Sequence, residues 1–136
     1  MYPDGHEILI IDDDAKRREL SERVLSEAGF VVTTVSEGFS AIRAAAGRRV
    51  ALAIAAVELP GALDGRSTAH QIRVRQPWLK VLFTGDVERF PWHRNRDCDD
   101  FIAAPFDRRD LLGCVFELLQ RPIEGGRTIY RDYRTG

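Results

Sequence analysis

The chain has 136 residues, of which 44% are hydrophobic and 30% charged, as is typical of a globular domain with one hydrophobic core. The formal net charge of −1 predicts no nucleic acid as partner, because surfaces that bind polyanions are strongly basic. Its apolar runs have the length of strands and are too short to span a bilayer, so no membrane association is expected.

The N-terminal segment and the cysteines indicate the compartment. Residues 1–6 lack the basic and then apolar pattern of a signal peptide. Cys98 and Cys114 stand alone, without the CxxC spacing of a metal or redox site. Two lone cysteines are best explained as thiols in a reducing compartment, so we predict a cytoplasmic protein.

Strand-like and helix-like segments alternate along the chain. The strand-like segments are apolar and mostly β-branched, whereas the helix-like segments carry apolar residues three and four positions apart. The predicted strands cover residues 7–11, 30–35, 50–57, 81–84 and 101–104, and the predicted helices cover residues 15–28, 36–46, 66–75 and 107–119.

Several residues predict where helices begin and end. Asp14 is placed to cap the first helix, and Gly29 to end it. Asp107 and Asp110 form a capping-box-like pair at the start of the last helix. Phe39 is expected on the inward face of its helix, because it has helical spacing with other apolar residues.

The segment between the fourth and fifth strands is unusual. Residues 85–100 should contain a crossover helix, but Pro91 lies in the middle of the segment and predicts a short or broken helix. Phe90 and Trp92 flank this proline. If either aromatic ring is exposed, it is a candidate anchor for a partner protein; otherwise both rings close the core.

The alternation predicts an α/β fold. Strands that alternate with helices form a parallel sheet with right-handed crossovers, and helices then cover both faces. We expect a doubly wound, five-stranded, flavodoxin-like three-layer sandwich with strand order 2-1-3-4-5, because no glycine-rich turn follows the first strand. Residues 1–121 are predicted to form a single domain, and residues 122–136 a polar C-terminal tail.

Four motifs at the predicted strand ends resemble a known family. They are Ile8 to Asp13, Val57 to Gly61 followed by Asp64 and Gly65, Leu82 to Gly85, and Asp99 to Phe106. In this order the motifs resemble the receiver domain of bacterial two-component response regulators, and the resemblance covers roughly residues 7 to 121.

The resemblance implies a site for phosphoryl transfer at the carboxyl end of the sheet. In the family, an aspartate after the third strand accepts the phosphoryl group, two acids after the first strand hold Mg²⁺, and a lysine after the fifth strand supplies positive charge. Asp12 and Asp13 match the acid pair. Thr84 matches the hydroxyl of the family's switch, and Phe101 matches its aromatic residue.

Two positions depart from the family pattern. The acceptor position is Ala56, and the lysine position, directly before Pro105, is Ala104. We therefore expect a degenerate receiver, or pseudo-receiver, whose crevice offers neither an attacking carboxylate nor a positive charge to a phosphoryl group. Asp12 and Asp13 are expected to bind Mg²⁺ weakly at most, with no other cofactor. The paired Arg17 and Arg18 are interpreted as part of a charged helix face.

The leading hypothesis is a non-enzymatic interaction module of phosphorelay signalling that binds a kinase, another regulator or a second copy of itself. One alternative is a receiver that is still phosphorylated on a surrogate acceptor such as Glu58. Another is a small flavodoxin-like enzyme or cofactor-binding domain, against which stands the lack of a glycine-rich phosphate loop. A substitution introduced at Ala56 is a further alternative, although it leaves Ala104 unexplained.

Overall fold

The computed structural model of the chain describes residues 6–86, 99–121, 123–124 and 127–128. The predicted broken helix, with its candidate anchors Phe90 and Trp92, lies almost entirely outside the described residues. Within residues 122–136, predicted as a polar tail, the structure has a short antiparallel pair formed by β6 (Ile123–Glu124) and β7 (Arg127–Thr128).

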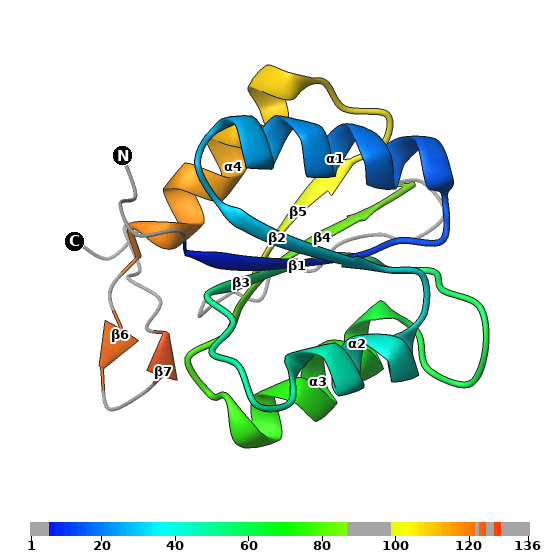
Figure 1. Cartoon of the computed structure of the whole chain (residues 1–136), viewed down its shortest axis with the longest axis vertical. Coiled ribbons are helices and arrows are strands. Elements are labelled where there is room, and N and C mark those ends of the chain that lie inside the picture. The colour runs from blue at the N-terminus through cyan, green and yellow to red at the C-terminus, as the bar shows by residue number, and fades with distance from the viewer. Residues whose placement is uncertain (1–5, 87–98, 122, 125–126, 129–136) are drawn as a thin grey trace, which may run out of the picture.

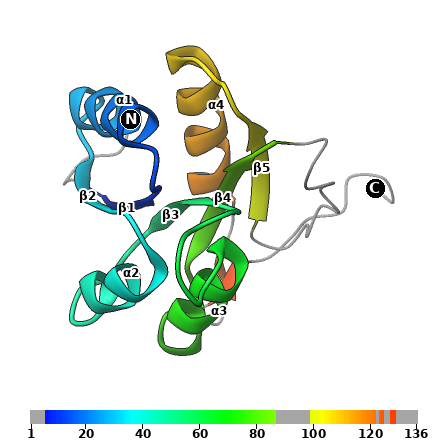
Figure 2. The same cartoon turned by 90° about the vertical axis from the view of Figure 1, so that its right-hand side faces the viewer.

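The centre of the fold is a five-stranded parallel sheet of order β2-β1-β3-β4-β5, which confirms the predicted order. Figures 1 and 2 show α1 and α4 on one face of this sheet and α2 and α3 on the other. The strands are β1 (Glu7–Ile11), β2 (Val31–Val35), β3 (Leu52–Ala56), β4 (Lys80–Gly85) and β5 (Asp99–Ala103), and the helices are α1 (Ala15–Glu27), α2 (Gly38–Ala45), α3 (Gly65–Arg75) and α4 (Arg108–Leu119).

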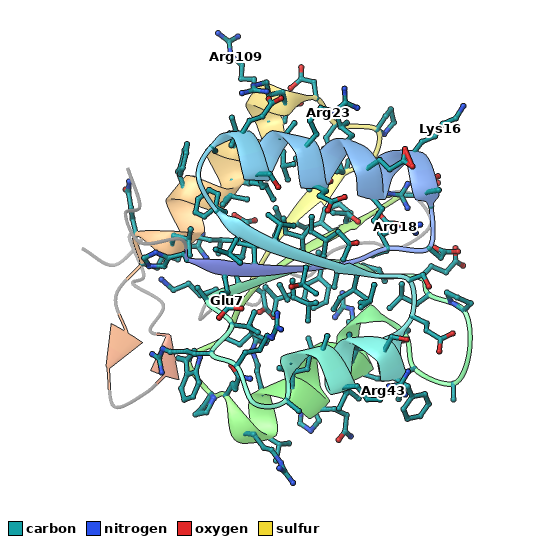
Figure 3. The ribbon with its side chains drawn as sticks, in the orientation of Figure 1. Glu7, Lys16, Arg18, Arg23, Arg43 and Arg109 are labelled. Carbon is teal, nitrogen blue, oxygen red and sulfur yellow. The ribbon has the colours of Figure 1, made fainter. Side chains whose placement is uncertain are left out.

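Strands β1, β3 and β4 are buried on both faces, which explains their nearly continuous apolar runs. Successive strand residues point to opposite faces. Ile8 and Ile10 therefore pack in the cluster beneath α1 and α4, together with Leu111 of α4. Leu9 and Ile11 pack in the cluster beneath α2 and α3. By contrast, Lys16, Arg23, Arg43 and Arg109 are exposed and point away from the sheet (Figure 3).

The predicted helix caps are confirmed. The Asp14 carboxylate accepts a hydrogen bond from the backbone N–H of Arg17 at 3.0 Å. Asp107 and Asp110 form a reciprocal capping box at the start of α4. Gly29 follows α1 with a φ of +101°, a conformation that glycine adopts without steric cost.

The strand β5 begins at Asp99, two residues earlier than predicted. Asp99 and Asp100 are buried, which apolar patterning cannot anticipate. Each carboxylate is paired with an arginine from a neighbouring helix or its end: Asp99 with Arg73 of α3, and Asp100 with Arg121, at 3.4 Å. Burial of a charged group is tolerated when such a partner is present.

The prediction that Phe39 faces inward is wrong, because 51% of its side chain is exposed. The buried residues of α2 are the small Gly38, Ala41 and Ala45. A Cβ atom at Gly38 would lie 2.4 Å from the Thr68 hydroxyl of α3. The close approach of α2 to α3 therefore requires small residues between the two helices and leaves Phe39 outside.

Gly65 holds the start of α3 against the end of β3. Its N–H donates a hydrogen bond to the Val57 carbonyl at 2.9 Å. A Cβ atom at this position would lie 2.1 Å from the Ala56 carbonyl oxygen, which is part of the backbone and cannot move aside independently. Only glycine fits here without displacing the end of β3.

We expect Gly65→Ala to destabilise the protein by roughly 1–3 kcal/mol, because overpacking at a backbone contact forces β3 and α3 apart. Gly113→Ala is the matched control, since nothing lies within 4 Å of a Cβ added at this glycine in α4. The control should be neutral or stabilising by up to about 1 kcal/mol. Urea unfolding measures both changes. Equal stabilities of the two variants would contradict the claim that only glycine fits at position 65.

Lys80, at the start of β4, is a buried cation at the amino end of the sheet. Its Nζ donates hydrogen bonds to the carbonyl of Leu119, the last residue of α4, at 3.2 Å, and to that of Arg121, just after the helix, at 2.6 Å. Burial, and then the nearby Arg121 guanidinium, lower the pKa of Lys80 from 10.5 to about 8.

This pKa predicts a pH-dependent stability. Between about pH 8 and pH 10.5 the unfolded state keeps the Lys80 proton that the folded state has released, so stability should rise with pH in this window. We expect the wild type to gain about 1–2 kcal/mol over this window relative to Lys80→Met, with other titrating groups cancelling in the comparison. Chemical unfolding measures the free energy of unfolding of both proteins as a function of pH. If the two curves run parallel, the Lys80 pKa does not cause the pH dependence.

Candidate functional site

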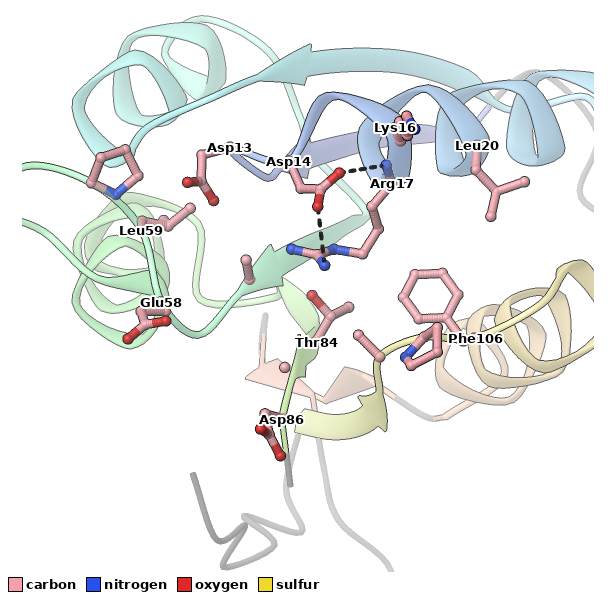
Figure 4. A pocket seen from close by; sticks show the side chains of 15 residues that line it. Asp13, Asp14, Lys16, Arg17, Leu20, Glu58, Leu59, Thr84, Asp86 and Phe106 are labelled. Carbon is pink, nitrogen blue, oxygen red and sulfur yellow. Dashed lines mark hydrogen bonds and ion pairs between the residues drawn. The ribbon is translucent and has the colours of Figure 1, made fainter. Parts of the chain in front are cut away.

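A pocket of about 820 Å³ lies at the carboxyl end of the sheet, where open α/β folds place their sites. Figure 4 shows it between the first turns of α1 and the loops that follow β3, β4 and β5. Its lining residues are Asp13, Asp14, Lys16, Arg17, Leu20, Ala56, Glu58, Leu59, Pro60, Thr84, Gly85, Asp86, Ala104, Pro105 and Phe106.

Asp12 and Asp13, the predicted acid pair, lie in different environments. Asp13 is exposed and lines the pocket. Asp12 is buried, with 4% of its surface exposed, and is not among the lining residues. The two carboxylates therefore have different environments, although they are adjacent in the sequence.

Asp12 is held by Arg17, from the first turn of α1. The Arg17 Nε donates to Asp12 Oδ2 at 2.5 Å, and Nη2 donates to Asp12 Oδ1 at 2.8 Å. Oδ1 also accepts the backbone N–H of Asp14 at 2.9 Å. This two-point contact is the strong form of an arginine–carboxylate pair, and its hydrogen bonds raise the pKa of Arg17.

Arg17 also approaches Asp14, whose Oδ2 lies 3.8 Å from its Nη1 (Figure 4). The hydrogen bond from the Arg17 backbone lowers the pKa of the Asp14 carboxyl, because it favours the ionised form. Arg18 donates to the Asp12 carbonyl at 2.7 Å. Both arginines thus turn back to the end of β1.

Two predictions about positive charge are therefore wrong. Arg17 and Arg18 are not simply part of a charged helix face, and the crevice does contain cationic groups, since Lys16 and Arg17 line it. The missed signal is the spacing of Asp12 and Arg17. An arginine in the first turn of a helix can reach the strand end that precedes it, but the same spacing also suits an exposed arginine.

Ala56, at the end of β3, and Ala104, just after β5, both line the pocket, and β4 lies between their strands. Ala56 pairs with Thr84 in the register of β3 and β4. The methyl groups of both alanines line a pocket whose carboxylates come from the loops after β1, β3 and β4 instead. The Ala104–Pro105 peptide bond is cis.

The Thr84 side chain lines the pocket, whereas Phe101 packs on the other face of the sheet, against the cluster beneath α2 and α3. Thr84 is 1% exposed, and its hydroxyl oxygen has no hydrogen-bond partner among the described residues. Leaving a buried hydroxyl unsatisfied costs about 1–3 kcal/mol. Figure 4 shows this hydroxyl pointing toward the space beneath Arg17.

The described residues do not fit a divalent cation. Both carboxylate oxygens of Asp12 already accept hydrogen bonds from Arg17, whose charge would repel a metal ion. Within residues 6–86 and 99–121, no group of three or more His, Cys, Asp or Glu side chains is placed to hold a metal. The predicted weak Mg²⁺ site on Asp12 and Asp13 would require Arg17 to leave.

The model of the response regulator receiver domain family matches residues 8–116. Transcriptional regulatory protein GltR of Pseudomonas aeruginosa is 34% identical over 98% of this chain and 59% of its own length. Transcriptional regulatory protein TcrA of Mycobacterium tuberculosis is 30% identical over 86% of the chain and 47% of its own length. The chain thus spans less than two thirds of these relatives.

Solved structures agree with this match. The receiver domain of the hybrid histidine kinase CckA has a TM-score of 0.71 and 26% identity, covering 84% of this chain and 99% of that one. The chemotaxis response regulator CheY4 of Vibrio cholerae has a TM-score of 0.75 at 20% identity, covering 85% and 99%, and supports the fold. None of the helices in the described part of the chain is long and apolar enough to cross a membrane.

Arg17→Ala tests whether Arg17 takes the place of a metal ion. We expect this change to destabilise the protein by roughly 2–4 kcal/mol, because it leaves the Asp12 carboxylate buried without its cation. Millimolar Mg²⁺ should then raise the melting temperature of the variant, since a ligand that binds only the folded state stabilises it.

The wild type and Arg23→Ala, which removes an exposed arginine of the same helix, should show little or no response to Mg²⁺. Thermal unfolding with and without Mg²⁺ measures all three proteins. If Mg²⁺ raises the melting temperature of the wild type as much as that of Arg17→Ala, Arg17 does not exclude the metal.

Proposed function

Because the chain belongs to the response regulator receiver domain family of two-component signalling, we propose that it acts there without phosphorylation, by contact with a protein partner. The observation that carries this proposal is the pair of methyl groups, Ala56 and Ala104, at the two pocket positions that the family resemblance assigns to an acceptor and a lysine. A methyl group can neither attack phosphorus nor neutralise charge.

The ion pair of Asp12 and Arg17 supports the same proposal. Catalysis of phosphoryl transfer depends on placing cations against the transferring oxygens. Arg17 is the cation nearest Asp12, but its Nε and Nη2 already donate to that carboxylate. The charge of the acid is thus offset within the chain, in one arrangement that needs neither metal nor phosphoryl group.

The partner would be a kinase, another regulator or a second copy of the chain. The names of GltR and TcrA describe transcriptional regulators, and this chain corresponds to only part of their length. That the matched part itself binds no nucleic acid, is not an enzyme and works in the cytoplasm stays a prediction from the sequence.

A surrogate acceptor is the specific alternative. Glu58 is exposed, lines the pocket and follows Ala56 by two residues. Its carboxylate belongs to the loop after β3, so an attack from it would come from a different point than one from the strand end. The outcome depends on whether Glu58 can replace an aspartate at position 56.

Acetyl phosphate with Mg²⁺, followed by intact mass spectrometry, tests the proposal. We expect no mass increase in the wild type, because no carboxylate stands at the end of β3. Glu58→Gln is treated in parallel. A stoichiometric phosphoryl adduct on the wild type would overturn the proposal, and its loss in Glu58→Gln would identify the surrogate acceptor.

A further inference from the structure

We propose that the pocket beside Ala56 and Thr84 is a docking site for a lysine side chain of the partner protein, with the ammonium group donating to the Thr84 hydroxyl. This inference rests on the proposed function, since it names the chemistry that a contact partner would bring to the pocket. Three features support it: the acidic residues around the pocket, the room left by two alanines, and the Thr84 hydroxyl, which has no partner among the described residues.

The charge around the pocket favours a cation. Asp13, Asp14, Glu58 and Asp86 line it, and all four residues are exposed. Of the two cationic lining residues, Arg17 is paired with the buried Asp12. Lys16 points outward from the start of α1 (Figure 3). The opening is therefore acidic, and it would attract an ammonium group and repel a carboxylate or phosphate.

The shape of the pocket suits a long side chain with a charged end. Ala56 and Ala104 contribute only methyl groups, which leaves room beside Thr84. Leu59, Pro105 and Phe106 provide apolar surface. The four methylene groups of a lysine can pack on such surface while its ammonium group reaches a polar one.

The Thr84 hydroxyl provides an acceptor at the base of the pocket. It is buried, lines the pocket and has no partner within the described part of the chain. A hydroxyl oxygen has two lone pairs and an ammonium group has three donors. One ammonium donor can therefore satisfy Thr84, while the others face water at the acidic opening of the pocket.

Lysine fits better than two other cations. A metal ion needs several oxygen ligands, and the described residues offer no group of three or more acidic, histidine or cysteine side chains for it. An arginine would bring a planar guanidinium with five donors, more than a single buried hydroxyl can accept. A compact ammonium group needs only one buried acceptor.

Titration of the ¹⁵N-labelled chain with n-pentylammonium chloride at low salt tests the proposal, because this ion mimics the lysine side chain. We expect saturable amide shifts at Asp13, Gly85 and Ala104, with a dissociation constant of about 1–10 mM for so small a ligand. The neutral 1-pentanol and the anion pentanoate should bind more weakly. Equal or tighter binding of either compound would overturn the proposal.

Variants locate the site. Thr84→Val keeps the side-chain shape without the hydroxyl and should raise the dissociation constant by about tenfold, whereas Glu58→Gln should raise it by roughly two- to fivefold. Glu22→Gln, an exposed acid of α1 that does not line the pocket, is the matched control and should change nothing. If Thr84→Val and Glu58→Gln bind pentylammonium as tightly as this control does, the pocket is not the binding site.

The phosphorylation assay separates this inference from the proposed function. A phosphoryl adduct together with pocket-specific pentylammonium binding would overturn phosphorylation independence and leave the lysine site standing. If no adduct forms and pentylammonium does not bind, phosphorylation independence would stand and the lysine site would be overturned. Displacement of pentylammonium by submillimolar Mg²⁺ would show that the pocket is a metal site and would overturn the lysine assignment.

Discussion

The ion pair between Asp12 and Arg17 determines the character of the whole site. It places a carboxylate in the interior at the end of β1 and brings the first turn of α1 back over it. Such a pair is retained only when both charges are well hydrogen-bonded, and here the backbone of Asp14 and the guanidinium share that task. Because Arg17 binds Asp12, only Asp13 of the two adjacent acids lines the pocket.

The second constraint is the presence of alanine, a residue with only a methyl side chain, at two strand ends. Parallel strands bring their carboxyl ends to one edge of the sheet, so residues distant in sequence meet there. Ala56 and Ala104 leave space at that edge, and Thr84 between them has a hydroxyl that finds no partner among the residues that the structure describes. The receiver fold thus surrounds a pocket that is lined at these strand ends by methyl groups and one hydroxyl.

Buried charge also shapes the opposite edge of the sheet. Asp99 and Asp100 occupy strand positions because Arg73 and Arg121 reach them from outside β5. Lys80 is buried because the last carbonyls after α4 accept its hydrogen bonds. In each case, the partner that makes burial possible lies far away in the sequence, so no local pattern announces it.

The amino-acid sequence was enough to predict the alternation of strands and helices, the strand order, the caps at Asp14 and Asp107 and the alanines at positions 56 and 104. These follow from apolar periodicity, from hydrogen bonds between near neighbours and from residue identity. The packing of the elements was needed to show that Arg17 pairs with Asp12, that Phe39 is exposed and that the Thr84 hydroxyl has no partner among the described residues. Side-chain direction and burial depend on which elements pack together, and that information is distributed over the whole chain.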